Sequence, residues 1–217
     1  KLSWEIPAGK WKVMIFVCVV DGDPNVDYLD PNAVELFVQM THQQYYDRFK
    51  EYFGNTVDST FFDEPTLYRC KARVWTDEFN EKFKAQYKFD PAQYYPALWY
   101  DIGPETAAAR NCLFGFRSEL YAAGFAGTIQ KWCEAHGITG TGHQDNEEVV
   151  NPVGTSGDLM KCFKYQDRPG IDKIGGNRPA ERFYKVVSSA AYNWGRQRVM
   201  SETYGAMGDI SIDTMYR

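Results

Sequence analysis

An uninterrupted apolar run is the feature that most constrains the fold of this chain. Residues 12–20 are apolar after the initial lysine and rich in valine. A strand buried on both faces has this composition, and such strands belong to parallel sheets with both faces covered. The run is too short to span a bilayer, so the sequence predicts no membrane-spanning segment.

Helical and strand-like segments alternate after this run. We predict helices over residues 30–54, 104–136, 156–165 and 177–194, and a further helix that begins at Thr76. The helix over residues 104–136 is expected to be interrupted near Gly124 and Gly127. We predict strands over residues 59–62, 138–142, 171–174 and 198–201. This alternation is typical of a parallel α/β fold.

The length sets the expected architecture. The chain has 217 residues, enough for one core but short of the roughly 250 residues of a typical eight-stranded α/β barrel. We therefore expect residues 1–217 to form a single domain, a partial (β/α)8 TIM-like barrel with helices outside and its first and last strands missing. An open doubly wound sheet is the alternative.

Two short β-prone runs each stop at a carboxylate and are followed by turn formers. They are Phe61-Phe62-Asp63-Glu64-Pro65 and Val199-Met200-Ser201-Glu202-Thr203-Tyr204-Gly205. In parallel α/β folds, functional residues gather at the C-terminal ends of strands. Two acids so placed form the kind of pair that cleaves glycosidic bonds. The alternative is that both are helix caps or surface acids.

A third polar group, His143-Gln144-Asp145, follows the predicted strand over residues 138–142. This position favours a pocket role for His143 over a structural one. The glycine-rich stretch before it, residues 137–142, does not have the order GxGxxG and does not open a helix. A dinucleotide-dependent α/β enzyme is therefore disfavoured, although it remains a rival hypothesis.

Charge and aromatic content narrow the class of ligand. The net charge is −5 and no basic run is present, which argues against a nucleic-acid partner. Aromatic residues make up 16% of the chain, more than a core usually needs, and aromatic rings suit the apolar faces of sugars.

Several motifs occur in a fixed order along most of the chain. They are Trp4-Glu5-Ile6-Pro7-Ala8-Gly9-Lys10-Trp11, Asp27-Tyr28-Leu29-Asp30-Pro31, Trp75-Thr76, Tyr95-Pro96-Ala97-Leu98, Arg110 to Glu119, Glu134-Ala135-His136-Gly137, Ser188-Ser189-Ala190-Ala191 and Val199-Met200-Ser201-Glu202. In this order the chain resembles the α-L-rhamnosidases of glycoside hydrolase family 106. Their collinearity carries the resemblance, since each motif alone is weak.

The resemblance implies an inverting hydrolase of terminal α-L-rhamnosyl bonds, with Glu64 as general acid and Glu202 as general base. Asp63 is a rival for Glu64, because adjacent strand residues point to opposite faces. Residues Asp63, Trp75, His143, Gln144, Asp145 and Tyr204 are candidates for substrate binding. Core packing is the alternative for Trp75 and Tyr204.

The resemblance also implies calcium as a cofactor, although no ligand set in this sequence matches one. Where the family carries a further acid after the central strand, this chain has His143-Gln144. That departure motivates a second hypothesis, a carbohydrate-binding relative without catalytic activity.

The expected partners are a poly- or oligosaccharide substrate and the remaining domains of a longer parent chain. The expected location is outside the cytoplasm, either secreted, periplasmic or at the cell surface.

Overall fold

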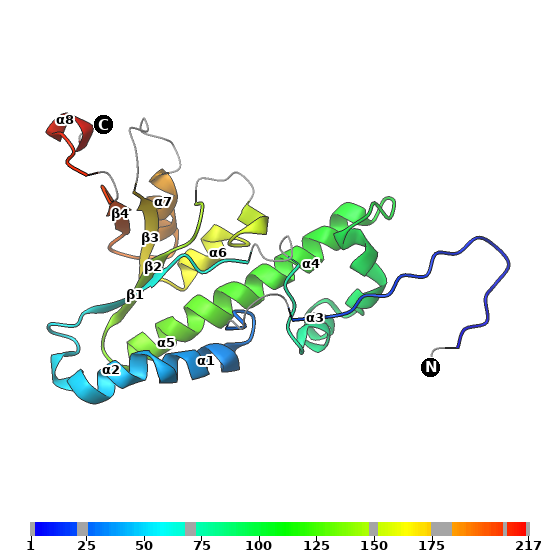
Figure 1. The fold of residues 1–217 in the computed structure, drawn as a ribbon, viewed down its shortest axis with the longest axis horizontal. Coiled ribbons are helices and arrows are strands. Elements are labelled where there is room, and N and C mark those ends of the chain that lie inside the picture. Colours follow the sequence, from blue (N-terminus) through cyan, green and yellow to red (C-terminus); the bar gives the residue numbers. More distant parts are fainter. Residues whose placement is uncertain are drawn as a thin grey trace.

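The computed structural model describes residues 3–20, 26–67, 73–147, 152–174, 184–205 and 208–215. Four strands form one parallel sheet: β1 (Ser59–Asp63), β2 (Thr139–His143), β3 (Arg168–Lys173) and β4 (Met200–Thr203). Their order in the sheet is β1-β2-β3-β4, the same as in the sequence (Figure 1). The predicted parallel α/β fold is confirmed, and each described strand overlaps a predicted one.

The first predicted helix is present but broken into α1 (Pro31–Met40), α2 (His42–Phe49) and the short 3-10 helix η1 (Lys50–Tyr52). Asp30 caps α1 by accepting a hydrogen bond from the Asn32 backbone at 3.0 Å, and Pro31 occupies the first turn. The break lies at Thr41, whose hydroxyl donates to the Phe37 carbonyl at 2.8 Å. Such back-bonding bends helices.

The long predicted helix is also interrupted where its glycines stand. It comprises α4 (Thr106–Tyr121), a π-helical turn η4 (Ala122–Ala126) and α5 (Gly127–Ala135). A Cβ at Gly124 would lie 2.7 Å from the Tyr28 carbonyl oxygen, so only glycine permits this close approach. The π turn therefore forms where the chain before α1 crosses the helix.

The other described elements are α3 (Phe79–Tyr87), η3 (Pro91–Leu98), η5 (Pro152–Gly154), α6 (Leu159–Lys164), α7 (Lys185–Asn193) and α8 (Ile212–Met215). The predicted start of a helix at residue 177 lies outside the described residues. Among the described helices, none has the length and apolarity needed to cross a membrane.

The predicted strand over residues 12–20 is absent from this structure. These residues form no regular secondary structure, and their apolar side chains are exposed. The segment runs past η3, where Phe16 stacks on Trp99 with ring centroids 5.1 Å apart, and leads away from the sheet (Figure 1). A strand needs a neighbouring backbone to pair with, and at this position it has none from the sheet.

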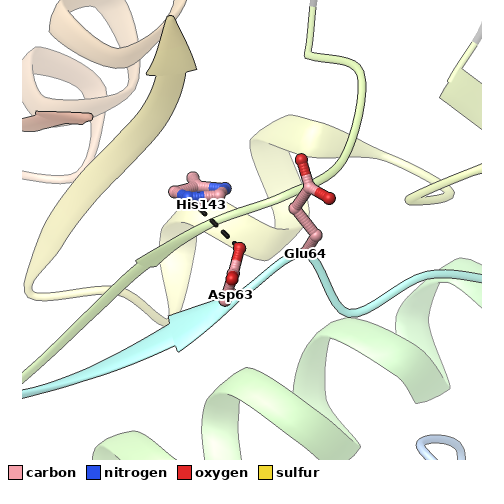
Figure 2. Close-up of side chains that lie close together, drawn as sticks. All are labelled: Asp63, Glu64 and His143. Atoms are coloured by element: carbon pink, nitrogen blue, oxygen red, sulfur yellow. Dashed lines mark ion pairs between the residues drawn. The ribbon is translucent and has the colours of Figure 1, made fainter. Parts of the chain in front are cut away.

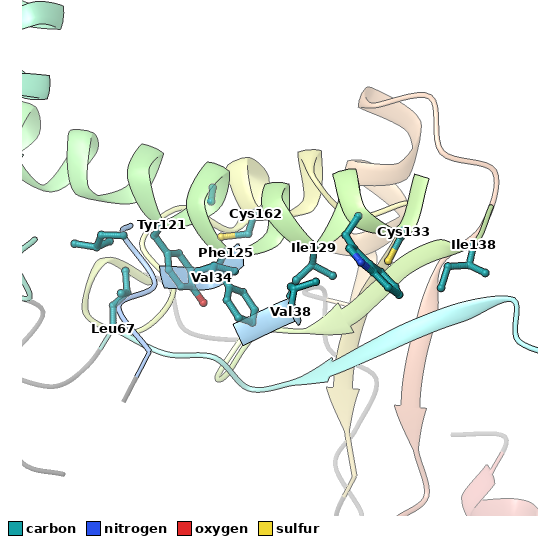
Figure 3. Close-up of a cluster of buried hydrophobic side chains, with 12 residues drawn as sticks. Val34, Val38, Leu67, Tyr121, Phe125, Ile129, Cys133, Ile138 and Cys162 are labelled. Carbon is teal, nitrogen blue, oxygen red and sulfur yellow. The ribbon is translucent and has the colours of Figure 1, made fainter. Parts of the chain in front are cut away.

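Helices cover one face of the sheet. On that face Phe62 of β1 packs against a buried cluster to which α1 and α5 contribute Val34, Val38 and Ile129. Figure 3 shows this cluster. Ile171 of β3 packs with Phe163 and Val187 of α6 and α7. The register places Phe62 and Ile171 on the same side of the sheet, since side chains alternate along each strand. The opposite face carries the residues described below.

Gly170 on β3 permits close packing within the sheet. A Cβ there would overlap the Gly142 carbonyl oxygen and the end of the Met200 side chain. We expect Gly170→Ala to lower the free energy of unfolding by about 1–3 kcal/mol, because the backbone atom in its way cannot move cheaply. Urea-unfolding midpoints would measure the change.

The matched control is Gly115→Ala in α4, where an added Cβ meets no atom within 4 Å. That variant should be more stable by about 0.5–1 kcal/mol, as alanine is favoured over glycine inside a helix. A Gly170→Ala variant as stable as the wild type would contradict the packing argument.

Candidate active site

The parallel register gathers charged groups on the face opposite the helices. Asp63 pairs with His143, His143 pairs with Gly170, and Asp172 pairs with Glu202. Residues paired in a parallel ladder point to the same side, and residues two apart in one strand do so as well. Asp63, His143, Asp172 and Glu202 therefore share one face at the C-terminal edge of the sheet.

His143 connects two strands that are not neighbours. Its Nε2 lies 2.8 Å from Oε2 of Glu202, although β3 runs between β2 and β4. Gly170, which pairs with His143, has no side chain to block this contact. A carboxylate can only accept hydrogen bonds, so Nε2 of His143 carries the proton and donates it. His143 is fully buried, whereas the Glu202 side chain is 43% exposed.

Asp63 and Glu64 approach the same imidazole from the end of β1. Oδ1 of Asp63 lies 3.5 Å from Nε2 of His143 (Figure 2). One carboxylate oxygen from each of Asp63 and Glu64 and one ring nitrogen of His143 all lie within 4.8 Å of one another. Glu64 has a φ of 44°, a left-handed conformation that is costly for a residue with a side chain. Figure 2 shows Glu64 just after the end of β1, with its carboxyl group pointing toward the chain that follows β2.

The surroundings change the pKa values of two of these groups. Desolvation, followed by the negative charges of Asp145 and Asp63, raises the pKa of Glu64. Burial alone would lower the pKa of His143, but the hydrogen bond to Glu202 and the nearby acids Glu147 and Asp172 outweigh it, and the pKa is raised. Both titrations are thus shifted toward the protonated form.

Two acids of this edge were not predicted as site residues. Glu147 lies in the loop after β2 and is almost fully buried, and its Oε1 has no hydrogen-bond partner among the described residues. Desolvation raises its pKa to about 7. Asp172 pairs with Glu202 in the ladder. The alternation of side chains along the predicted strand over residues 171–174 could have indicated Asp172. Nothing in the sequence indicates that Glu147 is buried.

The remaining predicted residues lie in different surroundings. Asp145 is near enough to affect the pKa of Glu64. Gln144 is fully buried and its Oε1 lies 2.7 Å from the Tyr121 hydroxyl, which also lies 2.6 Å from the Pro65 carbonyl oxygen. Since Tyr121 has one proton to donate, the Gln144 amide fits better with its nitrogen toward Tyr121.

Neither predicted aromatic contacts this cluster in the structure. Trp75 packs on Phe79 with ring centroids 3.8 Å apart, in the apolar cluster of α3, η3 and α4. Tyr204 follows β4 with a φ of 68°, and its hydroxyl donates to the Met215 carbonyl at 2.7 Å. The roles of Gln144, Trp75 and Tyr204 in sugar binding stay predictions.

The cluster of Asp63, Glu64 and His143 fits calcium poorly. Calcium takes six to eight oxygen ligands, and imidazole nitrogen is not among them. A metal on Nε2 of His143 would also need that nitrogen unprotonated, whereas its hydrogen bond to Glu202 needs the proton.

Comparisons with known proteins point to one family. The model of glycoside hydrolase family 106, described as alpha-L-rhamnosidase, matches residues 1–211. A solved structure, titled as that of a rhamnosidase from Novosphingobium sp. PP1Y, is similar with a TM-score of 0.65 at 18% sequence identity. The match covers 82% of this chain and 17% of that chain, and at this identity it shows the fold alone. A search of curated proteins found no match.

The buried acid Glu147 makes stability depend on pH. Its pKa is raised in the folded protein, so the stability it contributes is fully present at acidic pH and is lost as pH rises through about 7. We expect Glu147→Gln to be more stable than the wild type at pH 8, by on the order of 1–3 kcal/mol, and to lose this advantage at pH 4. Urea unfolding at both pH values would measure it.

Glu134→Gln, an exposed acid on α5, serves as the control and should differ little from the wild type at either pH. An equal effect of Glu147→Gln at pH 4 and pH 8 would show that the Glu147 carboxyl group is not held protonated by burial.

Proposed function

The chain belongs to glycoside hydrolase family 106, the α-L-rhamnosidase family, and we propose that it is part of a catalytic domain that hydrolyses terminal α-L-rhamnosyl bonds. The observation that carries the proposal is the arrangement around His143, with Glu202 on one side and Asp63 and Glu64 on the other. Glycosidases work with two carboxyl groups that flank the scissile bond.

Glu64 is the proposed general acid. A general acid must hold a proton near neutral pH, and burial together with Asp145 and Asp63 raises the pKa of Glu64 in the required direction. Its left-handed backbone places the carboxyl group at the exposed end of β1. From there it can protonate the glycosidic oxygen while the bond to the sugar breaks.

Glu202 is the proposed general base. His143 donates to its Oε2, which fixes the carboxylate and leaves Oε1 to take a proton from the attacking water. The pKa of His143 is raised despite its desolvation, and an imidazolium at this position would strengthen the hydrogen bond to Glu202. Because His143 is fully buried, it acts through Glu202 and is a positioning residue.

Helices cover one face of the sheet and leave the other open, which favours a partial barrel rather than a doubly wound sheet. A doubly wound sheet has helices on both faces, whereas a (β/α)8 barrel has them on one. Here α1, α5, α6 and α7 pack on the side of Phe62 and Ile171, and the opposite side carries the charged cluster. The C-terminal edge of that face is where barrel enzymes place their sites.

The substrate and location follow from the same proposal. We propose a rhamnosyl group at the end of a poly- or oligosaccharide, bound partly by Asp63, Asp145 and the aromatic residues Trp75 and Tyr204. A polymeric substrate cannot cross a membrane, so we place the protein at the cell surface, in the periplasm or outside the cell. The chain spans 17% of the solved rhamnosidase, and the rest of a longer protein is the proposed partner.

The two carboxyl roles differ in their dependence on the leaving group. We expect Glu64→Gln to lower kcat on an alkyl rhamnoside by about 10²–10⁴-fold. Its effect on an aryl rhamnoside with an acidic phenol should be far smaller, because that group leaves without a proton. Glu202→Gln should lower kcat on both substrates alike, since both need the water. Steady-state kinetics of the full-length protein would measure these effects.

The Asp63→Asn variant tests whether Asp63, and not Glu64, is the general acid. If that variant shows the leaving-group dependence and Glu64→Gln does not, Asp63 is the acid. Glu134→Gln should match the wild type throughout.

NMR of the first-formed sugar should show inversion, and retention would exclude the water-activating role of Glu202. Saturable sugar binding without turnover would favour a non-catalytic binding protein instead.

A further inference from the structure

A buried acid follows the strand that carries His143. β2 ends at His143, and Glu147 comes shortly after it and is only 3% exposed. Asn146, just before Glu147, has a φ of 54°, a left-handed turn that asparagine tolerates better than most residues. Because burying a carboxyl group is costly, its presence in the interior next to the candidate site calls for a physical reason.

The carboxyl group of Glu147 lies beside β3, just past the end of β2. The last pair between the two strands joins His143 and Gly170, whereas β3 continues to Lys173. The backbone of Asp172, which comes after this last pair, approaches the Glu147 carboxyl group as a hydrogen-bond donor. Glu147 is therefore placed next to the imidazole with which β2 ends.

Glu147 and His143 act on each other through their charges. Desolvation lowers the pKa of His143, whereas the hydrogen bond to Glu202 and then the charge of Glu147 raise it. Desolvation raises the pKa of Glu147, and the charge of His143 is among the influences that lower it. Each group thus favours the charged form of the other.

The other acids around His143 come from the three remaining strands and their ends. Each of them is at least partly exposed, so water screens its charge, whereas Glu147 is buried and is screened least. These other acids are Asp63, Glu64, Asp172 and Glu202.

The ionisation of His143 is decided at the ring nitrogen that does not face Glu202. Nε2 already carries a proton, which it donates to Glu202, so a second proton must bind to Nδ1. Nδ1 is buried, and it has no hydrogen-bond partner among the described residues; the same is true of Oε1 of Glu147. A positive charge on the ring is therefore one that the buried Glu147 carboxylate would stabilise.

We propose that Glu147 is a positioning residue, whose buried carboxyl group controls the charge of His143 and, through the imidazole, the hydrogen bond that holds Glu202. An imidazolium donates a stronger, charge-assisted hydrogen bond to a carboxylate than a neutral imidazole does. A fixed Glu202 is what the activation of water requires, so the catalytic consequence rests on the proposed function. The electrostatic link between Glu147 and His143 does not.

NMR titration of the intact protein without substrate tests this link. The loss of a signal in His143→Asn identifies the resonances of His143. We expect Glu147→Gln to lower the pH midpoint of His143 by at least about half a pH unit, because the negative charge is removed. Since the interaction is mutual, His143→Asn should raise the midpoint of the Glu147 carboxyl carbon by a similar amount. Glu134→Gln, the exposed control, should move neither midpoint.

The pH profile of kcat on an aryl rhamnoside gives a readout that a purely structural role would not move. In Glu147→Gln the alkaline limb should shift to lower pH together with the midpoint of His143. Glu147→Asp, which keeps a carboxyl group, should restore part of this shift, and Glu134→Gln should match the wild type.

An unchanged midpoint of His143 in Glu147→Gln would overturn the inference, as would a shifted midpoint with an unmoved pH profile. If Glu147→Gln does not fold, an unchanged Glu147 midpoint in His143→Asn would overturn it equally. Absence of turnover by the wild type, with both midpoints shifted as expected, would overturn the proposed function and leave the electrostatic link supported.

Discussion

The hydrogen bond between His143 and Glu202 joins two strands across a glycine in the strand between them. β2 and β4 are separated by β3, and Gly170, which pairs with His143, places no side chain of its own between them. The same glycine admits the Met200 side chain and the Gly142 carbonyl. Close packing of three strands at one point thus brings a buried imidazole under an exposed carboxylate, and the other charged groups are arranged around this pair.

The alternation of elements could be predicted from the sequence because it depends on local patterns. Asp30-Pro31 marks a helix start by capping, and Ser59–Asp63 ends where turn formers begin. Asp63, Glu64, His143, Asp145 and Glu202 were predicted on the rule that strand ends gather function. Their mutual contacts could not be predicted, because strand order and register are long-range properties. Glu147 was missed because its burial depends on how the loop after β2 folds back.

The segment over residues 12–20 shows a limit of local patterns. Its composition is that of an interior strand, yet composition specifies only what a segment can bury, while pairing requires an available edge. The structure has such an edge at β1 and an apolar cavity beside it, and the segment lies elsewhere.

Burial and exposure are combined in the site in a way that suits acid–base chemistry. His143 and Glu147 are buried, whereas Asp63, Glu64 and Glu202 reach solvent. The pKa of His143 is raised, and a proton on its ring would offset part of the negative charge that the acids bring together. The pKa of Glu64 is raised, which is the direction that a proton donor requires, while the hydrogen bond from His143 fixes one oxygen of Glu202.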